Sequence, residues 1–192
     1  MTIYQDAAMT PLLPRARVVE QIARHGGDIL AHAAMQGTKN FPHHGQTSVF
    51  AHSVAVAYLC VALALRLRLH VDMRALVRAA LLHDYFLYDW HAFDGGAHRL
   101  HGFFHPGRAL TNARADFALS PIEENAILRH MFPLTLIPPR CREGWLVCLA
   151  DKICAVCELA APAYLRLAAP MAERRALKAP PQEGGASSSF HA

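Results

Sequence analysis

The stretch Ala75–Trp90 places the strongest constraint on how this chain can fold. Its first half is apolar at three- and four-residue steps and follows Asp72, a favourable N-cap, so a helix is predicted. The helical pattern ends in the adjacent pair His83-Asp84. Burying two ionisable side chains is costly unless something compensates. A metal ion would compensate by taking both as ligands, whereas the plainer alternative is that His83 caps the helix C-terminus.

Helical patterns and turn signals alternate along the whole chain, and no strand pattern occurs. The expected fold is therefore all-α, a bundle of about six to eight helices. With 192 residues, 53% of them apolar, the chain can bury one sizeable core. We expect a loosely ordered segment at 1–14, one domain at 15–178 with its core at 48–168, and a flexible tail at 179–192.

Three local patterns lead to more detailed expectations. Gly26-Gly27 should interrupt the first helix, and Pro106 should lie in the first turn of a later one. The last long helix should run from Arg142 to about Leu167, with a further short helix after it. Its core-facing residues are predicted to be Trp145, Leu149, Ile153 and Val156.

Polar residues interrupt the apolar helical faces at intervals of about one helix plus one loop. They are His52, His83, Asp84, His130 and Asp151, and His105 opens a further helix. A helical bundle can aim one side chain from each successive helix at a shared interior point. Nitrogen and oxygen donors of this kind suit two divalent ions such as iron, manganese, cobalt, nickel or zinc.

The order His52, His83-Asp84, Asp151 resembles the signature of the HD-domain metal-dependent phosphohydrolases, including the flanks Ala-Leu-Leu-His-Asp and Leu-Ala-Asp-Lys, over about Ser48–Ala155. His105-Pro-Gly-Arg-Ala and Ile-Leu-Arg-His130 match the extra histidines of the dinuclear subgroup. The resemblance implies an HD-domain bundle in which His52, His83, Asp84 and Asp151 hold one metal ion. His105 and His130 would join a bridging Asp84 on the second ion.

The resemblance further implies hydrolysis of a phosphate ester or anhydride, most plausibly nucleotide-like, by a metal-activated hydroxide. The chain also resembles small HD proteins without an assigned substrate. Several dinuclear relatives carry Lys or His three or four residues after the Asp, where this chain has Leu87 and Tyr88. This departure counts against a cyclic dinucleotide and weakens the case for a dinucleoside tetraphosphate. Two alternatives stay open: a di-iron oxygenase on the same scaffold, and a non-catalytic regulatory HD module.

Five basic residues are candidates for contact with a phosphate, although each could equally lie on an exposed surface. Lys152 directly follows a predicted ligand and is also a catalytic candidate beside the His-Asp pair. Arg108 lies one turn after a predicted ligand, and Arg129 directly precedes another. His44 and His101 lie beside ligand-bearing segments and could act as donors or as a general acid.

The overall charge and composition of the chain limit the kinds of partner and the cellular compartment that we expect. The net charge of +4 is compatible with a small phosphorylated substrate but is too diffuse to indicate nucleic acid. Val54–Leu65 is apolar but shorter than the about 20 residues of a membrane span, so no membrane is expected. An odd number of cysteines and no signal peptide predict reduced thiols and a cytoplasmic protein. The oligomeric state stays open.

Overall fold

A computed structural model describes residues 15–43, 47–89 and 101–176, with the side chains of residues 101 and 161–176 outside the description. The predicted N-terminal segment 1–14 and the tail 179–192 also lie outside it. The described residues form α1 (Arg15–Ala31), α2 (Ala33–Gly37), a 3-10 turn (Thr38–Asn40), α3 (Val49–Arg66), α4 (Met73–Leu82), α5 (His101–Asp116), α6 (Pro121–Arg129) and α7 (Arg142–Ala176). No strand occurs among them, so the all-α prediction is confirmed.

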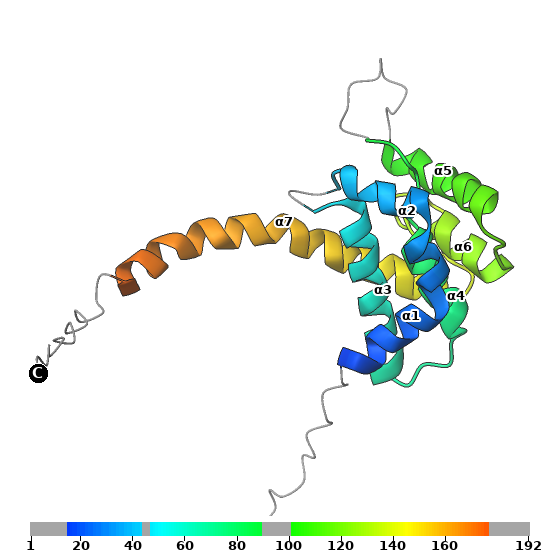
Figure 1. The fold of residues 1–192 in the computed structure, drawn as a ribbon, viewed down its shortest axis with the longest axis horizontal. Coiled ribbons are helices and arrows are strands. Elements are labelled where there is room, and N and C mark those ends of the chain that lie inside the picture. Colours follow the sequence, from blue (N-terminus) through cyan, green and yellow to red (C-terminus); the bar gives the residue numbers. More distant parts are fainter. Residues whose placement is uncertain (1–14, 44–46, 90–100, 177–192) are drawn as a thin grey trace, which may run out of the picture.

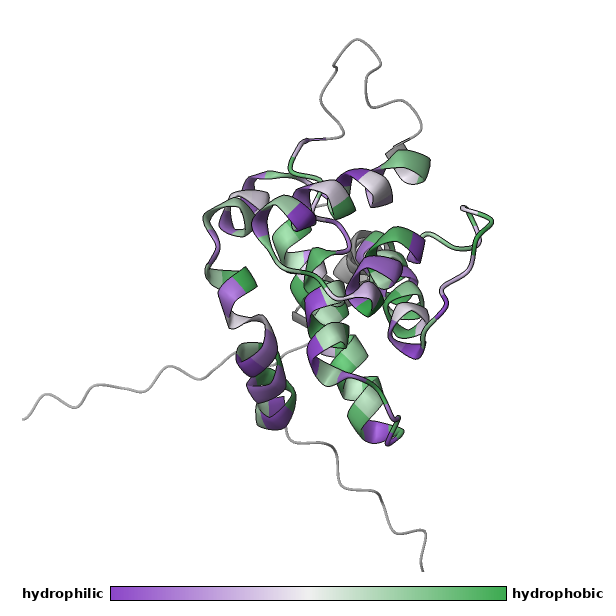
Figure 2. Ribbon diagram, turned by 90° about the vertical axis from the view of Figure 1, so that its right-hand side faces the viewer, coloured by the Kyte–Doolittle hydropathy of each residue, from purple (hydrophilic) through white to green (hydrophobic). Residues whose placement is uncertain are grey.

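Helix α4 is the central helix of the bundle, as its contacts with the surrounding helices show. It begins where the Asp72 carboxylate accepts a hydrogen bond from the Ala75 amide at 3.0 Å, as the N-cap pattern predicts. Every residue from Ala75 to Leu82 is buried, and α4 packs against α1, α3, α5, α6 and α7. Figure 2 shows hydrophobic and hydrophilic residues alternating along the helices, as expected where one face is buried. A helix buried on all sides brings its C-terminal end, with His83-Asp84, into the core.

The glycine pair Gly26-Gly27 does not interrupt the first helix, and the prediction of a break is wrong. Helix α1 continues through both glycines to Ala31. A Cβ atom on Gly26 would collide with the Leu81 side chain and would lie 3.1 Å from Val77 Cγ1 on α4, whereas one on Gly27 would meet nothing within 4 Å. Gly26 therefore permits a close approach of α1 to α4 rather than a turn.

Pro106 does not lie in a first turn, because α5 begins at His101 and contains Pro106 inside it. A proline within a helix removes one backbone donor without necessarily ending the helix, particularly near its start. The sequence pattern therefore placed the start of this helix too late.

The last helix differs from its prediction in length and in orientation. Helix α7 runs without a break to Ala176, where two helices were expected, and its C-terminal part extends away from the other helices (Figure 1). The residues predicted to face the core are between 40% and 64% exposed: Trp145, Leu149, Ile153 and Val156. Leu146, Val147 and Ala150 are buried instead. Both stripes are apolar, so periodicity alone could not choose between them.

Helix α3 is the one described helix that is long and apolar enough to cross a membrane, by length and composition alone. Much of it is buried against other helices, and it carries His52 into the interior. A core helix passes the same test, so this feature is weak support for a membrane span.

Candidate metal centre

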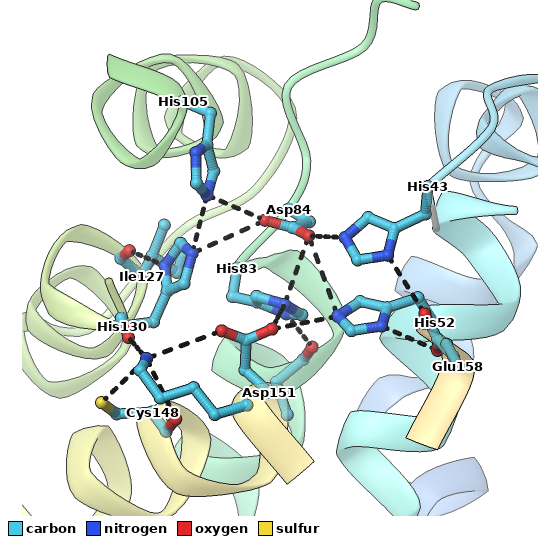
Figure 3. Close-up of polar contacts among 12 residues, drawn as sticks. His43, His52, His83, Asp84, His105, Ile127, His130, Cys148, Asp151 and Glu158 are labelled. Carbon is cyan, nitrogen blue, oxygen red and sulfur yellow. Dashed lines mark hydrogen bonds and ion pairs between the residues drawn. The ribbon is translucent and has the colours of Figure 1, made fainter. Parts of the chain in front are cut away.

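The six predicted ligands come together from five helices (Figure 3). His52 projects from the first turns of α3, His83 caps the C-terminus of α4, and Asp84 follows it directly. His105 comes from α5, His130 caps the C-terminus of α6, and Asp151 comes from α7. All six are buried. Side chains that span a hundred residues of sequence therefore line one interior point.

His83 and His130 are held by the same local device. His83 Nδ1 donates to the Ala80 carbonyl oxygen at 2.8 Å, and His130 Nδ1 donates to the Ile127 carbonyl oxygen at 2.7 Å. A carbonyl oxygen can only accept, so each Nδ1 carries a hydrogen. Capping and metal binding, which the sequence presented as alternatives for His83, are compatible, because the Nε2 atom of each ring faces the site.

Asp84 presents its two oxygens to two separate groups of imidazoles. Its Oδ2 lies 3.5 Å from His83 Nε2 and 3.9 Å from His52 Nε2. Its Oδ1 lies 3.2 Å from His105 Nε2 and 3.6 Å from His130 Nε2. A carboxylate in this position can serve two cations at once.

Asp151 completes the first group, and two facing imidazoles form the second. Asp151 Oδ1 lies 3.1 Å from His52 Nε2 and 3.7 Å from His83 Nε2. His105 Nε2 and His130 Nε2 lie 2.9 Å apart. The donor atoms within each group are close enough to hold a single ion.

Charge in the site is strongly coupled. Burial opposes ionisation of Asp84, but the neighbouring His83 and His105 hold its pKa well below the usual value. Burial also opposes a charge on His52, yet hydrogen bonds to Asp151 and Glu158 raise its pKa to about 10. Burial and the nearby His83 and His105 lower the pKa of His130 to about 3. His130 is therefore neutral at pH 7, with an electron pair available to a metal.

The hydrogen bonding of the site, and not only the residue types in it, indicates that the site fits divalent ions. His83 Nε2 and Asp84 Oδ1 are fully buried, and no group in the described part of the chain makes a hydrogen bond of good geometry to either atom, although His105 Nε2 lies 3.2 Å from Asp84 Oδ1. Buried polar atoms without partners are costly, and a cation would satisfy both. Among the six predicted ligands, two trios have donor atoms within 4.8 Å of one another and could each hold an ion: His52, His83 and Asp151, and His83, Asp84 and His130.

The comparison with protein-family models matches the HD domain to residues 49–156, more than half of the chain. This chain belongs to the HD-domain family. Its members are mostly metal-dependent hydrolases. No curated protein and no solved structure matches the chain. All six candidate ligands of this HD domain lie within the matched range.

Sequence reasoning missed two residues of the site. It selected His44, which lies outside the described residues, and not its neighbour His43. His43 is buried, with Nε2 3.0 Å from Asp84 Oδ2 and Nδ1 3.3 Å from Glu158 Oε2. Glu158 comes two helical turns after Asp151, and this spacing could have revealed that they share a face of α7. Nothing in the sequence distinguishes His43 from His44.

Lys152 lies at the edge of the HD site but is tied to the backbone. Its ammonium group donates to the His130 carbonyl oxygen at 2.8 Å and to the Cys148 carbonyl oxygen at 3.3 Å. It also lies 3.8 Å from Asp151 Oδ2, and the side chain is 40% exposed. These contacts join α7 to the end of α6 and leave the ammonium charge beside a candidate ligand.

Arg108 lies beside a pocket next to the site. The pocket has a volume of about 390 Å³ and is lined by Phe86, Phe104, Gly107, Arg108, Thr111 and Asn112. The Arg108 guanidinium carbon lies 5.1 Å from the centre of the Tyr88 ring. The Phe86 ring lies 5.9 Å from the His105 ring, which places the pocket against the second group of imidazoles.

The two remaining candidates are less well defined. Arg129 is half-buried, and its Nε atom has no hydrogen-bond partner among the described residues. His101 begins α5, but its side chain lies outside the description.

Proposed function

We propose that this HD domain is a dinuclear metal-dependent phosphohydrolase that cleaves a phosphate ester or anhydride of a nucleotide-like substrate. The observation that supports it most is the position of Asp84 between two groups of imidazoles, one on each carboxylate oxygen. Two ions bridged by one carboxylate are a common arrangement for hydrolysing phosphates. The donor set suits iron, manganese, cobalt, nickel or zinc.

Bound ions supply Lewis acidity, which lowers the pKa of water and neutralises charge on phosphoryl oxygens. The protein's own residues hold the candidate ligand side chains in fixed orientations. His83 and His130 are fixed by backbone carbonyls, and His52 Nδ1 donates to Glu158 Oε1 at 2.9 Å. Rings that are already held in place lose little entropy when they bind an ion, and the site needs little reorganisation during reaction.

The adjacent pocket supports a substrate with both an apolar ring and a phosphate. Phe86 and Phe104 provide aromatic walls on which a base can stack, and Arg108 provides a fixed positive charge. We assign Lys152 to the phosphate that is cleaved, because its ammonium group lies beside Asp151. Arg129, His44 and His101 remain candidates for further phosphate contacts. Within this proposal the protein acts in the cytoplasm, without nucleic acid or membrane as a partner.

The test is phosphate release from a panel of nucleotides and dinucleoside polyphosphates, with each of the five metals added in turn. Turnover should require metal and should fall by at least about a thousandfold in Asp84→Asn, because the amide cannot bridge two cations. His70→Ala, which removes an exposed histidine that is not a candidate ligand, is the matched control. Full turnover by Asp84→Asn would exclude this mechanism.

Further measurements on the same metal-loaded samples distinguish the hydrolase from the oxygenase and from the regulatory module. Oxygen consumption by the iron-loaded protein, with no phosphate released, would favour a di-iron oxygenase. Metal binding without turnover of any kind would favour a regulatory module.

A further inference from the structure

We propose that His43 is a seventh metal ligand of this site and that Glu158 holds it in position. Neither residue is among the six that the resemblance to HD-domain proteins supplies. The proposal rests on the metal binding of the proposed function, but not on its substrate or reaction.

Glu158 contacts two imidazoles, one with each of its oxygens (Figure 3). Its Oε1 lies 2.9 Å from His52 Nδ1, and its Oε2 lies 3.3 Å from His43 Nδ1. A carboxylate can only accept, so both Nδ1 atoms carry a hydrogen. The atom left to bind a metal is then Nε2 on each ring. A carboxylate that fixes the tautomer of a ligand histidine in this way is a general feature of metal sites.

The two rings point their Nε2 atoms the same way. Their centres lie 3.8 Å apart with the ring planes at 24°, so His43 is stacked on His52. His43 Nε2 lies 3.0 Å from Asp84 Oδ2, and His52 Nε2 lies 3.1 Å from Asp151 Oδ1. Glu158 contacts Nδ1 of both rings, and in both rings this leaves Nε2 directed at a carboxylate of the site. His43 is therefore positioned as a ligand in the same manner as His52.

The resulting donor group has the dimensions of a cation site. The donor atoms of His43, His52 and Asp84 all lie within 4.8 Å of one another, and all three residues are buried. His43 Nε2 lies 3.0 Å from Asp84 Oδ2, and His83 Nε2, which is fully buried and makes no hydrogen bond in the described part of the chain, lies 3.5 Å from the same oxygen. Imidazole nitrogens and carboxylate oxygens that converge in this way form a donor set suited to a divalent ion.

The experiment measures metal binding in the absence of substrate. Wild type, His43→Ala and His43→Phe are stripped of metal, titrated with Co²⁺ and followed by visible absorption, and their bound metal is measured by elemental analysis. The phenylalanine variant keeps a ring to stack on His52 but has no nitrogen donor. We expect both variants to bind one ion about 10- to 100-fold more weakly and to show a changed Co²⁺ spectrum. His70→Ala controls for the loss of an exposed histidine.

A second variant tests the role of Glu158. Glu158→Gln keeps the shape of the side chain but replaces one acceptor oxygen with an NH₂ donor, which cannot pair with an Nδ1 hydrogen. Metal affinity should fall in the same direction as for His43→Ala. Circular dichroism and thermal unfolding in chelator check that each variant is folded.

The proposal is overturned if folded His43→Phe binds Co²⁺ with the stoichiometry, affinity and spectrum of wild type. That result would leave the hydrolase proposal intact, because the other six ligands would still hold metal. Absence of metal binding by the wild type would overturn both, and metal binding without phosphate release would contradict the hydrolase alone.

Discussion

At the scale of single residues, the two ring nitrogens of the candidate ligands His83 and His130 have different surroundings. In His83 and His130, Nδ1 satisfies a carbonyl at the end of its own helix, and Nε2 faces the other helices. Both histidines are helix C-caps, so the hydrogen bond from Nδ1 forms within the last turn of the helix and needs no partner from another helix. Each ring is therefore held in one orientation by a bond within its own helix.

Proton release should accompany metal binding. With a pKa raised from 6.5 to about 10, His52 is protonated at neutral pH in the metal-free protein, and a metal ion must displace that proton. Affinity should therefore rise with pH between about 7 and 10. Calorimetric titration of Zn²⁺ in buffers of different ionisation enthalpy measures the number of protons released.

His130 should differ from His52 in proton release on metal binding. Its pKa is lowered to about 3, so it should release no proton above pH 5. Removing His52 by His52→Ala should reduce the number of released protons, and His130→Ala should leave it unchanged. Equal proton release by wild type and His52→Ala would contradict this assignment.

At the scale of elements, the contact between α1 and α4 depends on one glycine. Gly26→Ala should destabilise the protein by about 1–3 kcal/mol, because the new methyl group collides with Leu81. Gly27→Ala is its matched control, since position 27 is exposed and open. There the loss of backbone freedom in the unfolded chain should stabilise the protein by about 0.5–1 kcal/mol. Urea unfolding of both variants measures the difference, and equal effects would show that α1 does not pack closely at Gly26.

The face of α7 illustrates a decision that only packing makes. The stripe from Trp145 to Val156 and the stripe containing Val147 and Ala150 both have helical spacing. The structure buries the second, and this brings Asp151 and Glu158 toward His52. The orientation that completes the metal centre is therefore the one in which the larger apolar residues remain exposed.

At the scale of the whole molecule, the candidate ligands come from five successive helices, α3 to α7. Metal bound to all of them should cross-link the bundle in the folded state only. An ion present at about 100 times its Kd should add about 2.7 kcal/mol to the free energy of unfolding. Thermal unfolding with Zn²⁺ and with chelator measures this stabilisation as a shift in Tm.

The variant Asp84→Asn serves as the control for this shift. Loss of the Asp84 carboxylate should remove most of the metal-dependent increase in Tm. The Tm values of wild type and variant in chelator show separately what the substitution costs the metal-free protein. A shift of the same size in Asp84→Asn would indicate that the metal stabilises the protein from another site.

The sequence by itself determined the helical class, the N-cap at Asp72, and the six polar residues that converge. These features follow from local chemistry. A capping side chain bonds within its own helical turn, and an ionisable residue at a buried apolar position needs a partner or a metal ion to offset its loss of hydration. Only the tertiary structure decided which face of α7 is buried, why Gly26 is a glycine, and that His43 and Glu158 join the site. Those features depend on contacts between segments far apart in the chain, such as the 115 residues that separate His43 from Glu158, and no local pattern encodes such a distance.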